Sequence, residues 1–321
     1  MRIVISEFMD EDAVARIAAA HDTLYDPGLA DRPIDLKARV ADADALIVRN
    51  RTRVDATLIA SASRLKVVGR LGVGLDNIDV VAARARGIAV IPATGANARA
   101  VAEYVVTAAM FLLRGVYASS AAVANGDWPR AALSSGREIA GKTLGIVGFG
   151  AIGRLTADLA RRLSMRVVGF DPAHPASSEV WKSADTMSLS LEALLASADV
   201  VTLHVPLTEA TRNMIDARRL ASVKPGAILI NTARGGVVDE AALAAALRTG
   251  HVGGAALDVF SDEPLPSGSP LAGCPNLILT PHVAGITRES NTRVSMLIAD
   301  KVAAFLAGDA KRAADADLHA G

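Results

Sequence analysis

Three side chains suited to acid–base chemistry on a carboxylate-bearing molecule follow the last three apolar runs of the chain. They are Arg234, Glu263 and His282. A histidine can give a proton to a carbonyl oxygen or take one from a hydroxyl group, and a carboxylate bonded to its other ring nitrogen fixes the tautomer. An arginine fork can hold a carboxylate and polarise an adjacent carbonyl oxygen. Taken singly they could be a surface arginine, a solvated loop acid and a core histidine; their shared position after successive strands favours one catalytic site.

A glycine-rich turn upstream has the features of a dinucleotide-binding site. Its sequence is Gly148-Phe149-Gly150-Ala151-Ile152-Gly153, between an apolar run and a helical pattern. The first glycine permits a tight turn, the second lets the backbone approach a pyrophosphate, and the third lets helix and strand pack closely. The free N–H groups of the helix would face the phosphates. The alternative is a plain glycine turn in an α/β protein.

An acidic residue stands where such a site binds the adenosine ribose. Asp171 ends the next apolar run, 18 residues after Gly153, and Pro172 follows with no adjacent arginine. A carboxylate here accepts hydrogen bonds from the ribose hydroxyls and repels a 2′-phosphate, so NAD is favoured over NADP. The alternative is a solvated aspartate at a strand end.

The elements that must position these residues alternate along the chain in two blocks. Short apolar runs predict strands at 2–5, 45–48, 66–69, 88–91, 143–147, 166–170, 199–203, 227–231, 254–258 and 277–279. Periodic patterns predict helices at 11–20, 56–62, 78–86, 152–163, 191–196, 240–249 and 290–306, followed by a polar tail that is expected to be disordered. This alternation indicates the α/β class, with two doubly wound parallel-sheet domains.

A long apolar pattern at 98–120 separates the two blocks. It is rich in alanine and valine and has little polar surface. A helix that is apolar on most sides is buried in a core or in a subunit interface, and monomers rarely expose so large an apolar patch. We therefore expect a homodimer.

Composition and charge exclude several classes of protein. The chain has 321 residues, which suggests two domains, and its 51% hydrophobic content excludes disorder as the main state. Its 34 Lys+Arg balance 34 Asp+Glu and only 3% of residues are aromatic, so neither nucleic acid nor a membrane is an expected partner. Cys274 is alone and the six histidines lie far apart, so no disulfide and no metal are expected. Without a signal peptide or an apolar run of roughly 20 residues, a cytoplasmic location is expected.

Taken together, the motifs resemble those of the D-2-hydroxyacid dehydrogenase family, which includes phosphoglycerate, glycerate, hydroxypyruvate and D-lactate-type dehydrogenases. The resemblance covers nearly the whole chain and rests on segments 69–77, 148–153, 204–208, 232–236, 258–264 and 281–282. It implies an NAD-dependent oxidoreductase that interconverts a 2-hydroxy acid and its 2-oxo acid.

The resemblance also implies a role for individual residues. His282 is the general acid/base, Glu263 its orienting partner, and Arg234 binds the substrate carboxylate. Backbone N–H groups at Val73 and Gly74 would bind the same carboxylate. The residues implied around NAD are Gly148, Gly150, Ala151, Ile152, Gly153, Asp171, Val205, Thr232, Ala233, Arg234, Asp258, His282 and Gly285.

The family arrangement implies a flavodoxin-like substrate domain, residues 1–97 plus 287–321, and a Rossmann NAD-binding domain, residues 98–286. The cleft between them would close on ligand and exclude water. The helix 98–120 would be linker and dimer core, with Trp128 reaching the partner's cleft. Because the chain ends soon after the last helix, control by serine through a C-terminal regulatory domain is not expected.

Two arginines in the segment 48–53 bear on the substrate. Alternate residues of a strand share a face, so Arg49 and Arg51 are expected to point the same way. Arg51, nearer the strand end, is predicted to meet a second anion on the substrate; the alternative is a solvated basic edge. Within the family, segments 5–11, 49–52 and 93–97 are most similar to the sulfolactate dehydrogenase subgroup, with phosphoglycerate, malate-like, and hydroxypyruvate or glyoxylate substrates as rivals.

Two other functions on the same fold stay open at this point. One is a redox-sensing corepressor in which NAD binding changes a protein interface. The other is an NAD-linked enzyme that acts on phosphonate or formate in place of a 2-hydroxy acid.

Overall fold

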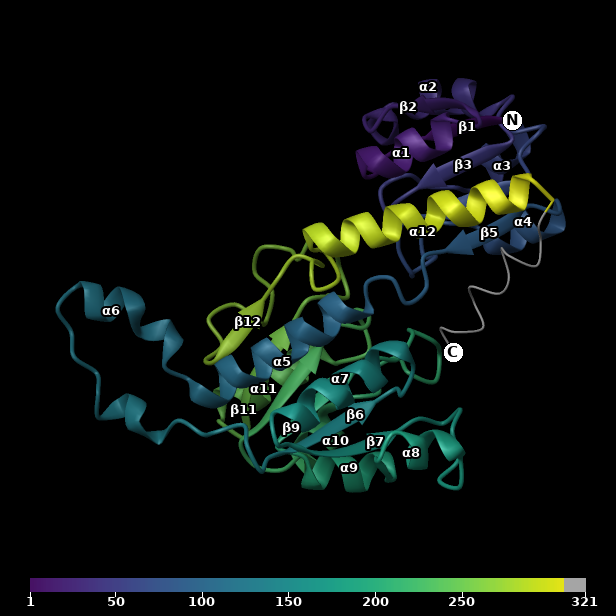
Figure 1. Ribbon diagram of the computed structural model, residues 1–321. Helices are drawn as coiled ribbons and strands as arrows, with labels where there is room; N and C mark the ends of the chain where they lie inside the picture. Colours follow the sequence, from purple (N-terminus) through teal and green to yellow (C-terminus); the bar gives the residue numbers. More distant parts are fainter. Residues whose placement is uncertain (309–321) are drawn as a thin grey trace. The chain divides into compact units, whose positions relative to one another are not determined.

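The computed structural model describes residues 1–308 and divides the chain into two compact units (Figure 1). Unit 1 comprises Met1–Asn97 and the chain from Ile286 on, and unit 2 comprises Ala98–Gly285. Each contains a parallel sheet with flanking helices, so the predicted α/β class is confirmed. The polar tail from residue 309 on, for which disorder is predicted, lies outside the described residues.

Unit 1 is built on a five-stranded parallel sheet in the order β2-β1-β3-β4-β5. Its strands are β1 (Arg2–Ile5), β2 (Asp22–Tyr25), β3 (Ala45–Val48), β4 (Val67–Arg70) and β5 (Ala89–Pro92). Its helices are α1 (Glu11–Ala18), η1 (Leu29–Asp31), α2 (Pro33–Val40), α3 (Ala56–Ser61), α4 (Val80–Ala85) and α12 (Arg288–Leu306). The central strand β3 is buried along its whole length, because helices cover both faces of the sheet.

Unit 2 is built on a seven-stranded sheet in the order β12-β11-β10-β9-β6-β7-β8. Its strands are β6 (Thr143–Val147), β7 (Arg166–Phe170), β8 (Met187–Ser188), β9 (Val200–Leu203), β10 (Ala227–Asn231), β11 (Val252–Leu257) and β12 (Leu277–Leu279). Its helices are α5 (Ala98–Arg114), η2 (Tyr117–Ser119), α6 (Ser120–Ala124), η3 (Ala132–Ser135), α7 (Ala151–Arg162), α8 (Glu179–Ser183), α9 (Leu191–Ser197), α10 (Ala217–Ser222) and α11 (Glu240–Arg248).

The strand order of unit 2 determines which loops are neighbours. All of its strand pairs are parallel, so the residues that follow each strand lie at one edge of the sheet. Strands β10, β11 and β12 are consecutive neighbours, which brings the loops after residues 231, 257 and 279 together. The loops after β6, β7 and β9 form a second group at the same edge, because β6 pairs with both β7 and β9.

The predicted helix 98–120 is shorter than expected. Helix α5 ends at Arg114, and Gly115 follows with a φ of +68°. Its apolar face is covered within unit 2, mainly by α7 and by strands β10 and β11 (Figure 1). The predicted burial of this helix is thus met within unit 2 by α7 and the sheet, and the homodimer stays a prediction. Among the described residues no single helix could cross a membrane, and α5 with residues 117–124 passes a length and composition test only as a pair bent by 70°.

Several elements had no predicted counterpart. They include β2, α2, α8, β8 and α10, together with the short turns η1 and η3. β2 and β8 are edge strands without an apolar run, and the three helices have at most eight residues. Short, half-exposed elements carry little periodic signal, because only one or two of their side chains reach the core.

Candidate active site

The acid–base pair predicted from sequence forms in unit 2. Nδ1 of His282 lies 2.8 Å from Oε2 of Glu263, and Oε1 of that carboxylate accepts the backbone N–H of Phe260 at 3.0 Å. The two side chains are 53% and 37% exposed, so the pair is accessible to a small molecule. With its proton held on Nδ1, the imidazole presents Nε2 as the nitrogen that can exchange a proton with a substrate.

The turn that carries His282 is held in an unusual backbone conformation. His282 has a φ of +56°, a value that costs energy in residues other than glycine. Its N–H donates to the carbonyl oxygens of Asp258 and Thr280 at 2.9 and 3.0 Å. The buried carboxylate of Asp258 accepts the N–H groups of Val283 and Ala284, each at 2.8 Å, and the hydroxyl of Thr280 at 2.6 Å. These bonds over-determine the turn and so keep His282 in place.

A tyrosine from helix α5 completes this network. The hydroxyl of Tyr104 lies 2.7 Å from Oγ1 of Thr280. Burial raises the pKa of Tyr104, so the phenol stays protonated. Sequence reasoning missed Tyr104 and Thr280 as site residues. A contact between residues 176 positions apart leaves no local signal in one sequence.

Arg234 lies in the loop after β10, which is tied down by the preceding asparagine. Oδ1 of Asn231 accepts the N–H of Ala233, and its Nδ2 donates to the carbonyl of Arg234, both at 3.0 Å. Gly235 packs so closely on the next loop that an added Cβ would lie 1.7 Å from the carbonyl oxygen of Phe260. The loop that carries Arg234 and the loop that carries Glu263 are therefore in contact, as expected from the neighbouring strands β10 and β11. A buried asparagine as the last residue of an apolar strand is the one local signal that could have identified Asn231.

The glycine-rich turn has the geometry that a pyrophosphate needs. Gly148 has a φ of +94°, and a Cβ at Gly153 would lie 2.3 Å from the carbonyl oxygen of Gly148. Gly150, the residue before α7, makes no side-chain cap, and a Cβ placed on it would meet no atom within 4 Å. Ala151 and Ile152 open the helix directly after it, so their N–H groups lie at an uncapped helix start beside open space. The turn fits an anion.

The ribose and nicotinamide positions fit as well. Asp171 follows β7, and Oδ2 of its carboxylate accepts the N–H of Phe149 at 2.7 Å, which places the carboxylate against the glycine-rich turn. Val205 and Ala233 are buried, and each is the second residue after its strand, β9 or β10. Oγ1 of Thr232 is a buried atom without a hydrogen-bond partner among the described residues, as expected of a group that binds a ligand. These residues can therefore hold NAD.

His204, after β9, is neutral under ordinary conditions. Loss of hydration lowers the pKa of His204 to about 3, and its Nε2 lies 3.1 Å from Oγ1 of Thr202. It thus adds no positive charge to the neighbouring glycine-rich turn.

The predicted substrate residues of unit 1 follow β3 and β4. Val73, 38% exposed, and Gly74 lie in the loop after β4. Arg49 and Arg51 do not share a strand face, because β3 ends at Val48. The guanidinium of Arg49 is half-buried and donates to Oδ1 of Asn291 on α12 at 2.8 Å, whereas Arg51 forms an exposed ion pair with Asp31. The expectation that the two arginines point the same way is therefore wrong.

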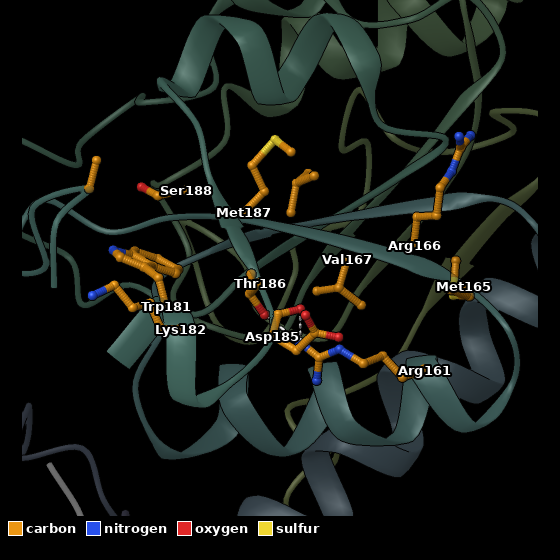
Figure 2. A pocket seen from close by; sticks show the side chains of 12 residues that line it. Arg161, Met165, Arg166, Val167, Trp181, Lys182, Asp185, Thr186, Met187 and Ser188 are labelled. Carbon is orange, nitrogen blue, oxygen red and sulfur yellow. Dashed lines mark hydrogen bonds between the residues drawn. The ribbon is translucent and has the colours of Figure 1, made fainter. Parts of the chain in front are cut away.

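A separate hollow of about 770 Å³ lies at the start of β7 and β8, the opposite end of these strands from the glycine-rich turn (Figure 2). Nη2 of Arg161 donates to the carbonyl oxygens of Ala184 and Asp185 and to the hydroxyl of Thr186. Lys182 is paired with Glu179 at 3.2 Å. These two cations hold the local chain, and none of the predicted site residues lines the hollow. Within residues 1–308 no group of His, Cys, Asp or Glu is arranged to hold a metal ion.

Comparison with known proteins identifies the class. Residues 106–284 match the model of the D-isomer specific 2-hydroxyacid dehydrogenase NAD-binding domain. The chain is 53% identical to (S)-sulfolactate dehydrogenase of Chromohalobacter salexigens over 300 residues, 94% of this chain and 96% of that protein. It is 44% identical over 275 residues to D-3-phosphoglycerate dehydrogenase of Mycobacterium tuberculosis, covering 85% of this chain and 51% of that protein, so it spans about half of that relative. D-lactate dehydrogenase of Aquifex aeolicus, solved with NAD and lactic acid, superposes with a TM-score of 0.82 at 28% identity over 97% of both chains.

The chain therefore belongs to the D-isomer specific 2-hydroxyacid dehydrogenase family. It is an NAD-dependent oxidoreductase that acts on the CH–OH group of 2-hydroxy acids.

Proposed function

We propose that this dehydrogenase acts on a 2-hydroxy acid that carries a second anion at C3, with 3-sulfolactate as the preferred substrate. The observation that carries the proposal is the 53% identity, over nearly the full length of both chains, to a protein named (S)-sulfolactate dehydrogenase. The two arginines after β3 supply the charge that such a substrate needs. Without a cationic partner, a second anion taken out of water would cost several kcal/mol.

The configuration at C2 is compatible with this substrate. The family is described as specific for D-isomers, whereas the relative is named for the (S) form. Sulfur at C3 outranks the carboxyl group in the naming rules, while the methyl group of lactate does not. (S)-Sulfolactate and D-lactate therefore have the same arrangement of carboxylate, hydroxyl and hydrogen around C2. One catalytic geometry can serve both acids.

The catalytic roles in this proposal follow from the chemistry of the pair in unit 2. NAD, when bound, accepts the hydride from C2 in the oxidative direction. His282 removes the hydroxyl proton through Nε2 and becomes an imidazolium, which the carboxylate of Glu263 on Nδ1 stabilises. Arg234 binds the C1 carboxylate and stabilises negative charge on the C2 oxygen.

The second anion is assigned to the loop that carries Arg49 and Arg51. Arg51, the residue predicted from sequence, would exchange its exposed pair with Asp31 for the substrate, and exposed pairs contribute only about 0–1 kcal/mol. Burial lowers the pKa of Arg49, which means that its charge has lost part of its hydration. A partly dehydrated guanidinium gains more from an anion than a fully hydrated one does. Both arginines are therefore included in the test.

We further propose that the enzyme is a homodimer whose contact is made by the segment after α5. The short helices η2, α6 and η3 contain no buried residue, and Tyr117, Val123 and Trp128 are 57%, 42% and 77% exposed. In Figure 1 this segment extends away from the sheet of unit 2. Helices this short are marginal in water unless something packs on them. A second copy supplies that packing, and Trp128 is the side chain expected to enter its site. A cytoplasmic location and the absence of nucleic-acid and membrane partners stay predictions.

A panel of 2-hydroxy acids with NAD, followed by NADH absorbance, tests the substrate. We expect the highest kcat/KM with 3-sulfolactate. Arg49→Ala or Arg51→Ala should lower this value roughly 10- to 100-fold, because a charge-assisted hydrogen bond contributes about 1.5–3 kcal/mol at 1.4 kcal/mol per decade. D-Lactate and D-glycerate should be nearly unaffected.

Other outcomes of the panel would identify one of the alternative substrates or functions. Higher efficiency with 3-phosphoglycerate would keep the second anion but change its chemistry. Higher efficiency with glyoxylate or hydroxypyruvate, or an equal loss on both kinds of substrate in the arginine variants, would refute the second-anion site. Turnover of formate or phosphite, or NAD-dependent peptide binding without turnover, would favour the remaining alternatives.

A further inference from the structure

A buried carboxylate lies beneath the loop of residues 49–52, the arginine loop. Glu7, the second residue after β1 and only 3% exposed, accepts four backbone N–H groups from this loop. Oε1 binds those of Arg49 and Thr52 at 2.8 and 2.9 Å. Oε2 binds those of Asn50 and Arg51 at 3.2 and 3.0 Å. Every N–H of the loop thus ends on one side chain.

The neighbours of Glu7 hold the same loop. The hydroxyl of Ser6 lies 2.9 Å from that of Thr52, and the guanidinium of Arg49 stands 5.7 Å over the ring centre of Phe8. The residues after β1 contact the arginine loop because β1 and β3 are parallel neighbours and both end at the same edge of the sheet. The carbonyl side is held separately, since Nδ2 of Asn77 donates to the carbonyl of Thr52 at 2.7 Å and to that of Arg49 at 3.4 Å.

Glu7 is ionised in spite of its burial. Burial alone raises the pKa of a carboxyl group, but the donated N–H bonds outweigh that effect and the pKa of Glu7 lies below its usual value. Consecutive N–H groups that converge on one point form an anion site, and here the protein's own carboxylate occupies it. A negative charge beneath the loop also balances the positive charge of the adjacent arginines.

We propose that Glu7 is a positioning residue for substrate recognition: it fixes the backbone of the arginine loop, and through it the side chains that bind the second anion of the substrate. This inference rests on the proposed function, which assigns the loop to that anion. Glu7 itself touches no substrate in this proposal. An error of about 1 Å in the position of a binding group can cost up to a hundredfold in rate.

A matched control is available at the start of β3, the strand that the arginine loop follows. Asp44 precedes β3, is fully buried, accepts the N–H of Arg2 at 2.9 Å, and pairs with Arg64 and Lys66 at 3.2 and 3.1 Å. It is thus also a buried carboxylate that holds unit 1 together. It lies at the opposite edge of the sheet from the arginine loop, because β3 runs between them. Its loss should affect stability without affecting substrate choice.

The test compares Glu7→Gln with Asp44→Asn in the full-length enzyme, with 3-sulfolactate and D-lactate as substrates. Glu7→Gln replaces one oxygen by an amide nitrogen, so two N–H groups of the loop lose their acceptor. We expect kcat/KM for 3-sulfolactate to fall about 10- to 100-fold, mainly through KM, and that for D-lactate to fall less than about threefold. Asp44→Asn should lower Tm and leave the ratio of the two substrates unchanged.

A double variant separates positioning from general destabilisation. If Glu7 acts through Arg49, Glu7→Gln combined with Arg49→Ala should be no worse for 3-sulfolactate than Arg49→Ala alone, within about a factor of two. If Glu7→Gln does not fold, Glu7→Asp, which keeps the charge but is one methylene shorter, is measured in the same assays with the same expectation.

The outcomes distinguish this inference from the proposed function. Selective loss in the arginine variants, with an unchanged substrate ratio in the Glu7 variant, would overturn the positioning role and leave the proposed substrate standing. If the arginine variants show no selectivity, the proposed second-anion site fails, and the role of Glu7 fails with it. An equal shift of the ratio in Asp44→Asn would show that any loss of stability in unit 1 has this effect, and would also overturn the inference.

Discussion

At the scale of single residues, this enzyme repeatedly uses a buried or half-buried carboxylate to hold a functional loop by its N–H groups. Glu263 holds Phe260 and orients His282, Asp258 holds the turn around His282, Asp171 holds the glycine-rich turn, and Glu7 holds the arginine loop. A carboxylate has two oxygens with about four acceptor positions, so one side chain can fix several backbone groups at once. The bonds are charge-assisted and therefore stronger than those between neutral groups.

Removing the proton-transfer group should stop catalysis without weakening cofactor binding. We expect His282→Ala to lower kcat by about 10²–10⁴, because that is the usual contribution of a general acid or base. The affinity for NAD, measured by calorimetry, should change little. Glu263→Gln is the companion variant: it should cost less at its optimum and, for oxidation of the hydroxy acid, shift the acidic limb of the pH–rate profile to lower pH, since the imidazolium loses its anionic partner. A His282→Ala enzyme of normal rate would show that the proton goes elsewhere.

His204 should make the protein less stable in mild acid. Its pKa is about 3 in the folded protein, against 6.5 for the unperturbed group. Between these two values the unfolded chain binds a proton that the folded chain does not, so stability rises with pH through this window and is lost as pH falls below 6.5. The contribution reaches at most about 1.4 kcal/mol per pH unit.

His204→Gln removes this contribution. Between pH 7 and pH 5 the variant should lose about 2 kcal/mol less stability than the parent protein, as measured by urea unfolding at several pH values. The matched control is His21→Gln, because His21 keeps most of its hydration and partial burial is the main cause that lowers the pKa of its ring. Parallel pH dependences in parent and His204→Gln would contradict a neutral His204.

At the scale of elements, the proposed catalytic residues lie in loops after parallel strands, and packed helices contact these loops. The turn after β12 depends on α5, because Tyr104 on that helix binds Thr280, which binds Asp258 after β11. Helix α5 in turn packs on α7, whose start is the glycine-rich turn. The acid–base turn and the cofactor turn therefore share one packed element.

Breaking the Asp258 network should disturb this turn. In Asp258→Asn an amide N–H₂ faces N–H donors, and a buried donor without an acceptor costs about 1–3 kcal/mol. Because His282 has a φ of +56°, the turn should relax, and kcat should fall at least about tenfold. Thermal unfolding and steady-state kinetics measure the two effects. Tyr104→Phe removes only the hydrogen bond between Tyr104 and Thr280 and should lower Tm and kcat less than Asp258→Asn does. A larger loss in Tyr104→Phe would show that helix α5, and not the Asp258 carboxylate, is the main support of the turn.

At the scale of the whole molecule, the chain forms two units of parallel sheet, each with its functional loops after the strands. Unit 2 holds the acid–base pair and the glycine-rich turn, and unit 1 holds the arginine loop and its carboxylate. The short helices η2, α6 and η3 in the segment after α5 contain no buried residue.

The oligomeric state follows from that segment. Sedimentation at micromolar concentration should show a dimer, because Tyr117 and Val123 are exposed on helices too short to be stable alone and Trp128 is exposed in the loop that follows them. Trp128→Asp together with Val123→Asp should shift the equilibrium toward monomer. The matched control is Val81→Asp, an equally apolar exposed position on α4 of unit 1, which should leave the dimer intact. A parent protein that sediments as a monomer would refute the proposal.

The sequence by itself determined those features whose causes lie in residues that are neighbours along the chain. The strand–turn–helix at 143–162 and the apolar runs that end before Arg234 and His282 have local causes: burial on both faces of a parallel strand, and the steric needs of a tight turn. The pairing of Glu263 with His282 was implied by the family resemblance, and the strand order β10-β11-β12 gives its physical reason.

Only the tertiary structure decided which distant residues meet. Glu7 binds a loop 42 to 45 positions away, and Tyr104 binds Thr280 across 176 positions, because neighbouring strands and packed helices bring these segments together. The directions of Arg49 and Arg51 depended on their partners, Asn291 on α12 and Asp31 in η1, which lie 242 and 20 positions away along the chain. Helix α5 stayed with its own unit because α7 covers its apolar face. Apolar periodicity predicts that one face of a helix is buried. The three-dimensional packing of the whole chain determines which element covers that face.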